Sequence, residues 1–273
     1  TVFGLIVAII LQIFYNYIVA KIDSIVNDME DASITLIDIL VAHRGLQSRF
    51  PENTLLALKK AIDAGAKYIE LDVQFSADCL PIIYHDPDLQ RVSGIKGNVW
   101  DYPLKELLCI SAYEPDRLGN RFKTETIAPL KALVDLLKEN PQVTAFVELK
   151  EESIVHCGRD LMLERVMHIL ASVKSQVVLI SYDYCVVEAA TKAQWGQVGV
   201  VLKQWQDLVT DTVKNIGSDY IFVDHEKMPQ QITGLDAIKG ILVAYEVGDI
   251  ALGKELINKG VSMLETFEIE RLS

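Results

Sequence analysis

Residues 68–75 read Tyr-Ile-Glu-Leu-Asp-Val-Gln-Phe, a short apolar run that two acidic residues interrupt at a spacing of two. Side chains two positions apart on a β-strand point to the same face of the sheet, so Glu70 and Asp72 share a face. In a closed barrel that face is either the interior or the outside. Two carboxylates inside a barrel need a cation beside them. The run therefore predicts a strand and, if it faces inward, a cation site.

Runs of this kind recur along the chain and alternate with amphipathic stretches, which is typical of a parallel sheet built from βα units. The strand candidates are Leu36–Ala42, Tyr68–Phe75, Leu80–Tyr84, Thr144–Leu149, Val177–Ser181, Val198–Leu202, Tyr220–Val223, Ile241–Tyr245 and Val261–Glu265. Only residues 76–79 separate the second candidate from the third, which is too short for a crossover between parallel neighbours. We therefore expect 80–84 to fold back antiparallel on 68–75. The other candidates predict an α/β fold, a (β/α)8 or TIM barrel.

Helices are predicted between the strands at Thr54–Ala64, Leu130–Lys138 and Asp249–Asn258, each followed by a glycine or an Asn-Pro pair. The stretch 86–128 is rich in proline and glycine and is too long for an ordinary barrel loop. We interpret it as a small insertion over the barrel mouth, after the antiparallel arm. The barrel domain is expected to occupy residues 36–273.

The first twenty residues contain no charged side chain, and a run of that length spans a bilayer as a helix. A cleavable signal peptide and a buried core helix are alternatives, but no basic segment precedes the apolar run and Ile18 is poorly suited to a cleavage site. We predict a single-pass transmembrane anchor at 1–20, which attaches the protein to a membrane, and a tether at 21–35. Lys21 alone specifies the orientation weakly.

Composition limits the partners of this chain. Its 273 residues are 50% hydrophobic and can fill a large core, and the net charge of -12 with no basic run argues against a nucleic-acid partner. An anionic substrate would need local positive charge, such as a metal. The four cysteines form no CxxC pair, so we interpret them as free thiols, which favours the cytoplasmic side for the barrel.

Barrel active sites lie where strands end, and polar residues follow, close or lie within several of the strand candidates. They are His43-Arg44-Gly45, Glu70 with Asp72, His85-Asp86 and Glu148-Leu149-Lys150. If Glu148 points the same way as Glu70 and Asp72, three carboxylates offer the hard oxygen ligands that suit one divalent cation, Mg²⁺ or Ca²⁺. For any single acid the alternative is a solvated loop residue.

His43 and His85 each follow an apolar strand directly, where an imidazole reaches the mouth of a barrel. Beside a metal, two histidines suggest a general base that activates an attacking oxygen and a general acid that protonates a leaving alkoxide. Arg44 and Lys150 would neutralise the nonbridging oxygens of a phosphate in the transition state. A structural role for a lone histidine and a solvated surface position for each base are the alternatives.

Five ordered motifs resemble those of the glycerophosphodiester phosphodiesterase family. They are His43-Arg44-Gly45, Pro51-Glu52-Asn53-Thr54, Glu70-Leu71-Asp72, His85-Asp86 and Glu148-Leu149-Lys150, and the similarity extends to Leu89, Arg91 and Ser93-Gly94. It covers residues 42–150. Motifs in this order and at this spacing are highly specific.

The resemblance implies a barrel with a metal held by Glu70, Asp72 and Glu148, and acid and base roles for His43 and His85. It also implies hydrolysis of glycerophosphodiesters to sn-glycerol 3-phosphate and an alcohol. In one mechanism discussed for the family, a neighbouring substrate hydroxyl attacks phosphorus. The cyclic phosphate formed in this way is then opened by water.

The C-terminal half departs from the family pattern. Ala244–Gly248 stand where members tend to have Trp-Thr-Val-Asn, and Leu264–Thr266 replace Ile-Thr-Asp. The extra carboxylate of Glu246 could bind a cationic headgroup, pair with Lys150 or mark a changed active site. Two other functions therefore remain open: lysophospholipase D-like or sphingomyelinase D-like cleavage of intact lysolipids, and a catalytically inactive, membrane-bound binding module.

Overall fold

Strand β2 (Tyr68–Phe75) is buried along almost its whole length, because parallel strands flank it on both sides. The computed structural model describes residues 38–230, 232 and 239–272, together with residues 12, 15–19, 21 and 22 near the N-terminus. Strand β1 (Leu40–Ala42) pairs with one edge of β2 and β5 (Thr144–Leu149) pairs with the other. The sheet therefore continues around β2 in both directions.

Eight parallel strands close into a barrel, which confirms the (β/α)8 prediction. After β1, β2 and β5 the barrel continues through β6 (Val177–Ser181), β7 (Val198–Val201), β8 (Tyr220–Asp224), β9 (Ile241–Tyr245) and β10 (Met263–Thr266). Strand β10 pairs with β1, so the barrel has no open edge. Strand β3 (Pro81–Ile83) runs antiparallel to β2, as the short connection predicted.

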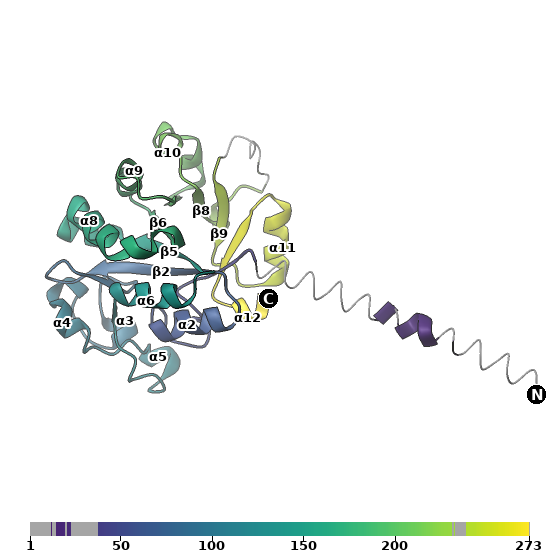
Figure 1. Ribbon diagram of the computed structural model, residues 1–273, viewed down its shortest axis with the longest axis horizontal. Coiled ribbons are helices and arrows are strands. Elements are labelled where there is room, and N and C mark those ends of the chain that lie inside the picture. The colour runs from purple at the N-terminus through teal and green to yellow at the C-terminus, as the bar shows by residue number, and fades with distance from the viewer. Residues whose placement is uncertain are drawn as a thin grey trace, which may run out of the picture.

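Helices surround the barrel, as Figure 1 shows. They are α2 (Leu55–Asp63), α6 (Lys131–Glu139), α7 (Glu151–Cys157), α8 (Arg159–Leu170), α9 (Tyr184–Lys192), α10 (Asp211–Ile216), α11 (Ile250–Asn258) and α12 (Ile269–Leu272), with the 3-10 turns η2 (Ala171–Gln176), η3 (Trp205–Val209) and η4 (His225–Lys227). The predicted helices α2, α6 and α11 lie within one residue of their expected bounds. Thr54 and Asp249 cap α2 and α11 by accepting hydrogen bonds from the backbone N–H groups of Ala57 and Leu252.

Alternation along the strands separates two apolar layers. The interior of the barrel holds Val41, Phe146, Val178, Ile180, Val201, Tyr220, Phe222, Val243 and Met263. The Phe146 ring meets Tyr220 and Phe222 edge-on, at centroid distances of 4.9 and 5.0 Å. The opposite faces of the strands pack against the helices. Because side chains alternate, positions two residues beyond these interior ones, toward the carboxyl ends, line the barrel mouth.

The segment between β3 and β4 (Ala128–Pro129) folds beside the barrel around a small core of its own. It contains α3 (Gln90–Ser93), η1 (Val99–Asp101), α4 (Leu104–Leu107) and α5 (Pro115–Leu118). Figure 1 shows α3, α4 and α5 gathered on one side of the barrel. Strand β4 then pairs antiparallel with β3 and returns the chain to α6.

The predicted anchor at 1–20 lies for the most part outside the described residues. No helix within the described part of the chain combines the length and the apolar character needed to cross a membrane.

The interpretation of all four cysteines as free thiols is wrong. Cys79, in the turn between β2 and β3, forms a disulfide with Cys157 at the end of α7, and Cys109 and Cys185 are free and exposed. The pair is 78 residues apart in the chain, and only the folding of α7 back along β2 brings it together. The cysteine argument for the cytoplasmic side therefore no longer holds.

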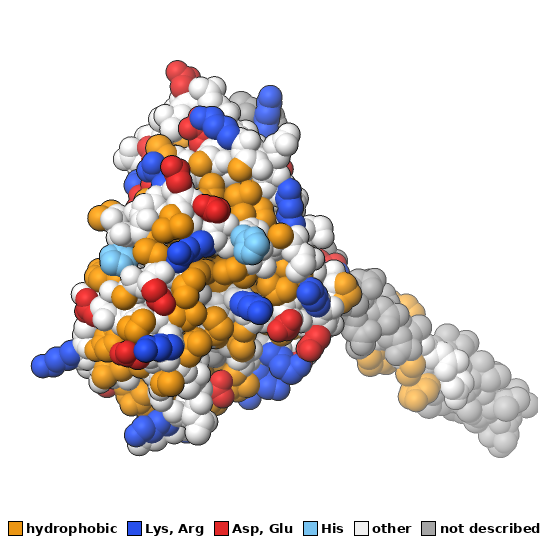
Figure 2. Space-filling model, turned by 60° about the vertical axis from the view of Figure 1, so that its left-hand side comes forward, with side chains coloured by type: hydrophobic (Ala, Val, Ile, Leu, Met, Phe, Trp, Pro, Cys, Tyr) orange, Lys and Arg blue, Asp and Glu red, His pale blue; other side chains and the backbone are white. Residues whose placement is uncertain are grey.

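Charged side chains of both signs are interspersed with hydrophobic ones on the face drawn in Figure 2. The sequence has 38 acidic and 26 basic residues, and the acidic side chains on this face are not gathered into one area.

We expect the Cys79–Cys157 disulfide to stabilise the barrel, because it closes a long loop in the unfolded chain. Replacing both cysteines by serine should lower the free energy of unfolding by about 2–4 kcal/mol in urea titrations. The matched control is the Cys109→Ser, Cys185→Ser variant, which keeps the bridge and should unfold like the wild type. Equal midpoints for wild type, control and the disulfide-free variant would contradict a stabilising bridge.

Candidate functional site

The polar residues predicted from strand ends meet at the carboxyl mouth of the barrel. Asp72 and Glu148 lie at paired positions on the adjacent strands β2 and β5, so their side chains project from neighbouring places on the inner wall. Only β1 separates β10 from β2, and Glu265 of β10 pairs in register with Val41, an interior position of β1. Glu265 thereby comes within 4.8 Å of His43 and Glu70. The polar mouth of the barrel therefore lies next to the apolar layer that fills the interior.

Glu70, Asp72 and Glu148 offer oxygen atoms that all lie within 4.8 Å of one another. Glu70 and Asp72 are 2% and 1% exposed, and Oε1 of Glu70 is buried with no hydrogen-bond partner among the described residues. Burial, together with repulsion from Asp72 and Glu265, raises the pKa of Glu70 well above its usual value. A divalent cation would favour the ionised forms of these acids, and three hard oxygen ligands fit that requirement.

Two basic side chains hold the central carboxylate of this group. Lys150 Nζ lies 3.1 Å from Asp72 and 2.8 Å from Glu148, and Arg44 Nε lies 3.2 Å from Asp72. Burial alone would raise the pKa of Asp72, but Lys150 and Arg44 lower it below its usual range. Asp72 is therefore ionised and paired, whereas burial raises the pKa of Glu148 despite Lys150.

The Pro51–Thr54 turn, which is the second of the five motifs, contacts the site directly. The Asn53 side chain donates to Oδ2 of Asp72 at 2.8 Å and accepts from the Asp72 backbone N–H at 3.0 Å. Thr54 caps α2 by accepting from the backbone N–H of Ala57. A Cβ on Gly45 would come within 2.5 Å of the Ala57 backbone, so only glycine lets the turn after β1 approach α2 so closely.

A chain of ion pairs leads from this turn to the second histidine. Buried Glu52 accepts from Arg44 at 3.0 Å and from two nitrogens of Arg91 at 2.7 Å. Arg91 also donates to Asp86, whose other contact is Nδ1 of His85 at 2.6 Å. An ionised carboxylate carries no proton, so Nδ1 of His85 donates the hydrogen bond to Asp86. Nε2 of His85 is therefore available for proton transfer.

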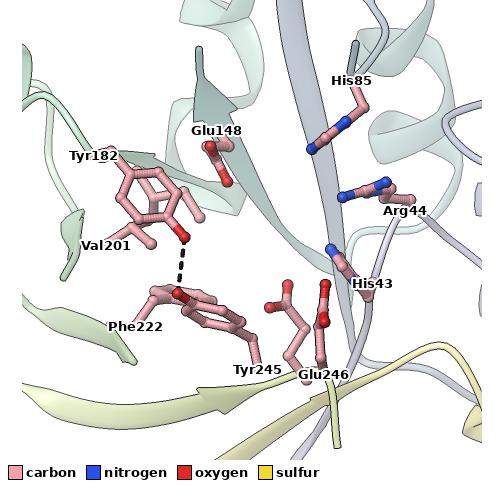
Figure 3. A pocket seen from close by; sticks show the side chains of 11 residues that line it. His43, Arg44, His85, Glu148, Tyr182, Val201, Phe222, Tyr245 and Glu246 are labelled. Atoms are coloured by element: carbon pink, nitrogen blue, oxygen red, sulfur yellow. Dashed lines mark hydrogen bonds between the residues drawn. The ribbon is translucent and has the colours of Figure 1, made fainter. Parts of the chain in front are cut away.

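The histidines stand on the same side of a pocket with an empty volume of about 480 Å³, part of it open to solvent. Figure 3 shows His43, Arg44 and His85 facing Tyr182 and Tyr245 across it. Nε2 of His43 lies 3.9 Å from Glu70. Burial, with a further contribution from Arg44, lowers the pKa of His43 from 6.5 to about 3. His43 is therefore neutral near pH 7 and can accept a proton.

Every residue predicted for the site is brought into this region: His43, Arg44, Glu70, Asp72, His85, Glu148 and Lys150. Glu52, Asn53 and Arg91 were recognised in the sequence only as parts of motifs, and their positioning roles were not predicted. Glu114 of the insertion was missed altogether. It is 4% exposed, accepts from the Glu52 backbone N–H at 2.8 Å and pairs with Arg117 at 2.6 Å. An acid beside a proline in a long loop gives no local sign of such a contact.

Parallel strands whose carboxyl ends gather acids, bases and two histidines define a (β/α)8 barrel with a candidate active site at its mouth. The sequence profile of the glycerophosphoryl diester phosphodiesterase family matches residues 43–232. The chain belongs to this family of hydrolases.

Curated relatives match over shorter stretches. Glycerophosphodiester phosphodiesterase 1 of Mus musculus is 34% identical over 111 residues, which cover 40% of this chain and 33% of that protein. A glycerophosphodiester phosphodiesterase of Caldanaerobacter subterraneus is 32% identical over 120 residues, 44% of this chain and 48% of its own length. The matches thus span about a third to a half of those relatives.

Solved structures share the fold. A phosphodiesterase of Oleispira antarctica, solved with the product sn-glycerol-3-phosphate, has a TM-score of 0.74 at 23% identity and covers 88% of this chain and 97% of its own. The glycerophosphodiester phosphodiesterase of Thermotoga maritima has a TM-score of 0.67 at 20% identity, over 85% and 95% of the two chains. At these identities the likeness concerns the barrel.

The low pKa of His43 predicts a specific pH dependence of stability in metal-free buffer. Between pH 6.5 and about 3 the unfolded chain protonates this histidine and the folded chain does not. Unfolding therefore takes up a proton, and stability falls as the pH is lowered through this window, by at most about 1.4 kcal/mol per pH unit. His43→Asn should lose less stability than wild type in urea titrations from pH 7 to pH 4.5 with EDTA. Parallel curves for the two proteins would refute the shift, and exposed His168→Asn is the control.

Proposed function

We propose that this chain hydrolyses glycerophosphodiesters to sn-glycerol 3-phosphate and an alcohol. The observation that carries the proposal is the meeting of a three-carboxylate group, two histidines and two basic side chains at one pocket. Membership of the family supports it. The Oleispira antarctica relative, whose structure holds sn-glycerol-3-phosphate, supports the identity of the product.

Glu70, Asp72 and Glu148 would hold one divalent cation, Mg²⁺ or Ca²⁺. Bound there, it would supply Lewis-acid stabilisation of the charge that develops on the phosphate oxygens. Arg44 and Lys150 lie against the same carboxylates and would donate hydrogen bonds to the nonbridging oxygens. Their placement supports a phosphate position between the carboxylates and the pocket.

The two histidines would divide the proton transfers. His43 would accept the proton of the attacking hydroxyl, because burial keeps its imidazole unprotonated near neutral pH. His85 would donate a proton to the leaving alkoxide from Nε2, while Asp86 holds the ring through Nδ1 and stabilises the charged imidazolium. Arg91 and Glu52 fix Asp86 in turn and act as positioning residues.

The purified protein should release glycerol 3-phosphate from glycerophosphocholine in Mg²⁺ or Ca²⁺, and EDTA should abolish the release. His43→Ala and His85→Ala should each lower kcat by about 10²–10⁴-fold, because each removes a proton-transfer group. His168→Ala, on the exposed side of α8, is the matched control and should keep full activity. Absence of release in every metal would contradict the proposal. Cleavage of a lysolipid in its place would instead indicate lysophospholipase D-like activity.

We further propose that residues 1–20 attach the chain to a membrane and that the barrel lies on the oxidising, non-cytoplasmic side of that membrane. The uncharged N-terminal run supports the attachment, and the Cys79–Cys157 disulfide supports the oxidising side.

The full chain should resist carbonate extraction from membranes, and Ile9→Arg, Ile10→Arg should release it, because two charges in the apolar run oppose insertion. In intact cells or spheroplasts, externally added protease should reach the barrel. Extraction of the unmodified chain by carbonate would contradict the membrane attachment. Full protection of the barrel from protease would contradict the proposed side of the membrane.

A further inference from the structure

Gln74 is a third polar residue on the face of β2 that carries Glu70 and Asp72, because it lies two positions beyond Asp72. Its side chain is fully buried. A buried amide is stable only when its oxygen and its nitrogen both find hydrogen-bond partners. The partners of Gln74 therefore show which parts of the barrel it holds together.

A hydrogen-bond chain with a single direction runs through Gln74. The backbone N–H of Phe75 donates to Oγ of Ser153 at 2.9 Å, and the Ser153 hydroxyl donates to the amide oxygen of Gln74. The amide nitrogen of Gln74 donates to the backbone carbonyl of His85 at 2.9 Å. A backbone N–H can only donate and a carbonyl can only accept, so the two ends of the chain fix the orientation of the Gln74 amide.

His85 lies beyond the strand that leads to it, since β3 ends at Ile83. Its imidazole contacts Asp86 through Nδ1 at 2.6 Å, and 29% of its side chain is exposed. Gln74 holds the same residue by its main chain. Contacts to both the ring and the main chain restrict the direction in which the imidazole faces the pocket, where Figure 3 shows it.

Helix α7 carries Ser153, which is 0% exposed, and packs along β2. At the end of the helix, Cys157 forms the disulfide with Cys79 in the turn after β2. The neighbouring His156 ring stacks on Trp100 of η1, with the ring centroids 5.7 Å apart. The helix is thus held both to the turn after β2 and to the insertion. Ser153 therefore has a fixed position from which its hydroxyl orients Gln74.

We propose that Gln74 and Ser153 are positioning residues for His85, which they hold so that its Nε2 can protonate the leaving alkoxide. This inference rests on the proposed phosphodiesterase function and adds two residues to its acid side. Gln74 acts on the main chain of His85, and Ser153 acts through Gln74. A displacement of about 1 Å can lower a rate about 10²-fold, so the loss of one such contact should be visible in the rate.

The sharpest test compares two substrates that differ in their need for an acid. The alkoxide that leaves glycerophosphocholine needs a proton, whereas the phenolate that leaves glycerophospho-4-nitrophenol is stable without one. Release of the alcohol is followed in a single turnover, so that later steps do not enter. Gln74→Met should lower the rate about tenfold or more for glycerophosphocholine and less than about twofold for the nitrophenyl ester. His85→Ala should show the same contrast with a larger loss.

Ser153→Ala should show this contrast too, and the double variant should lose no more than Gln74→Met alone, because the two residues act in series. The matched control is Gln176→Met. The Gln176 amide also donates to backbone carbonyls, but it lies at the amino end of β6 and does not line the pocket. The control should leave the ratio of the two rates unchanged.

A second readout does not depend on turnover. The Nδ1 proton of His85 gives an NMR signal in protein labelled with ¹⁵N-histidine, and its absence in His85→Ala assigns it. Gln74→Met should shift or broaden this signal, because the hydrogen bond from the ring to Asp86 changes when the main chain of His85 moves. Gln176→Met should leave the signal in place.

An equal loss on both substrates in Gln74→Met would overturn the inference, because the change would then be a general loss of structure. An unchanged His85 signal in the folded variant would also overturn it. Additive losses in the double variant would contradict the action of Ser153 through Gln74. A shifted signal in a protein whose wild type cleaves neither substrate would leave the positioning role standing and contradict the hydrolysis alone.

Discussion

The pairing of Asp72 with Arg44, Lys150 and Asn53 is the interaction on which the whole site depends. An ionised carboxylate that is 1% exposed is stable only if nearly all of its hydrogen-bonding capacity is used. Arg44 comes from the turn after β1, Asn53 from the turn before α2, and Lys150 from the end of β5. One buried charge thus joins three segments that are separate in the sequence, and it fixes the geometry of the carboxylate group.

The ion-pair chain through Glu52 extends this constraint outward to the insertion. Glu114 lies in the segment between β3 and β4 and binds the backbone of Glu52, while Arg91, from the same segment, binds its side chain. His85 is oriented through Asp86 at the other end of the chain. The insertion is therefore part of the machinery that positions a histidine, and its short helices pack to hold Arg91 and Glu114 in place.

Two sets of strands supply different kinds of side chains to the barrel mouth. Strands β1, β2 and β5 and their following turns supply the carboxylates, basic groups and histidines that suit a phosphate. Strands β6 to β10 and the residues that follow them supply aromatic rings and two further carboxylates, of which Glu265 is buried and lies within 4.8 Å of His43 and Glu70. The first set follows the family motifs and the second departs from them.

The sequence by itself determined the barrel and the acids, bases and histidines predicted for its mouth, because both follow from local patterns. Strand periodicity, the short connection at 76–79, the spacing of Glu70 and Asp72, and the positions of His43 and Glu148 at strand ends are readable residue by residue. Only the tertiary structure decided the Cys79–Cys157 disulfide, the contact of Asn53 with Asp72 and the contact of Glu114 with Glu52. Each of these joins residues far apart in the chain, and barrel closure and strand register decide which distant side chains meet. Glu265 also became part of the site only when β10 paired with β1 and turned this carboxylate into the barrel mouth.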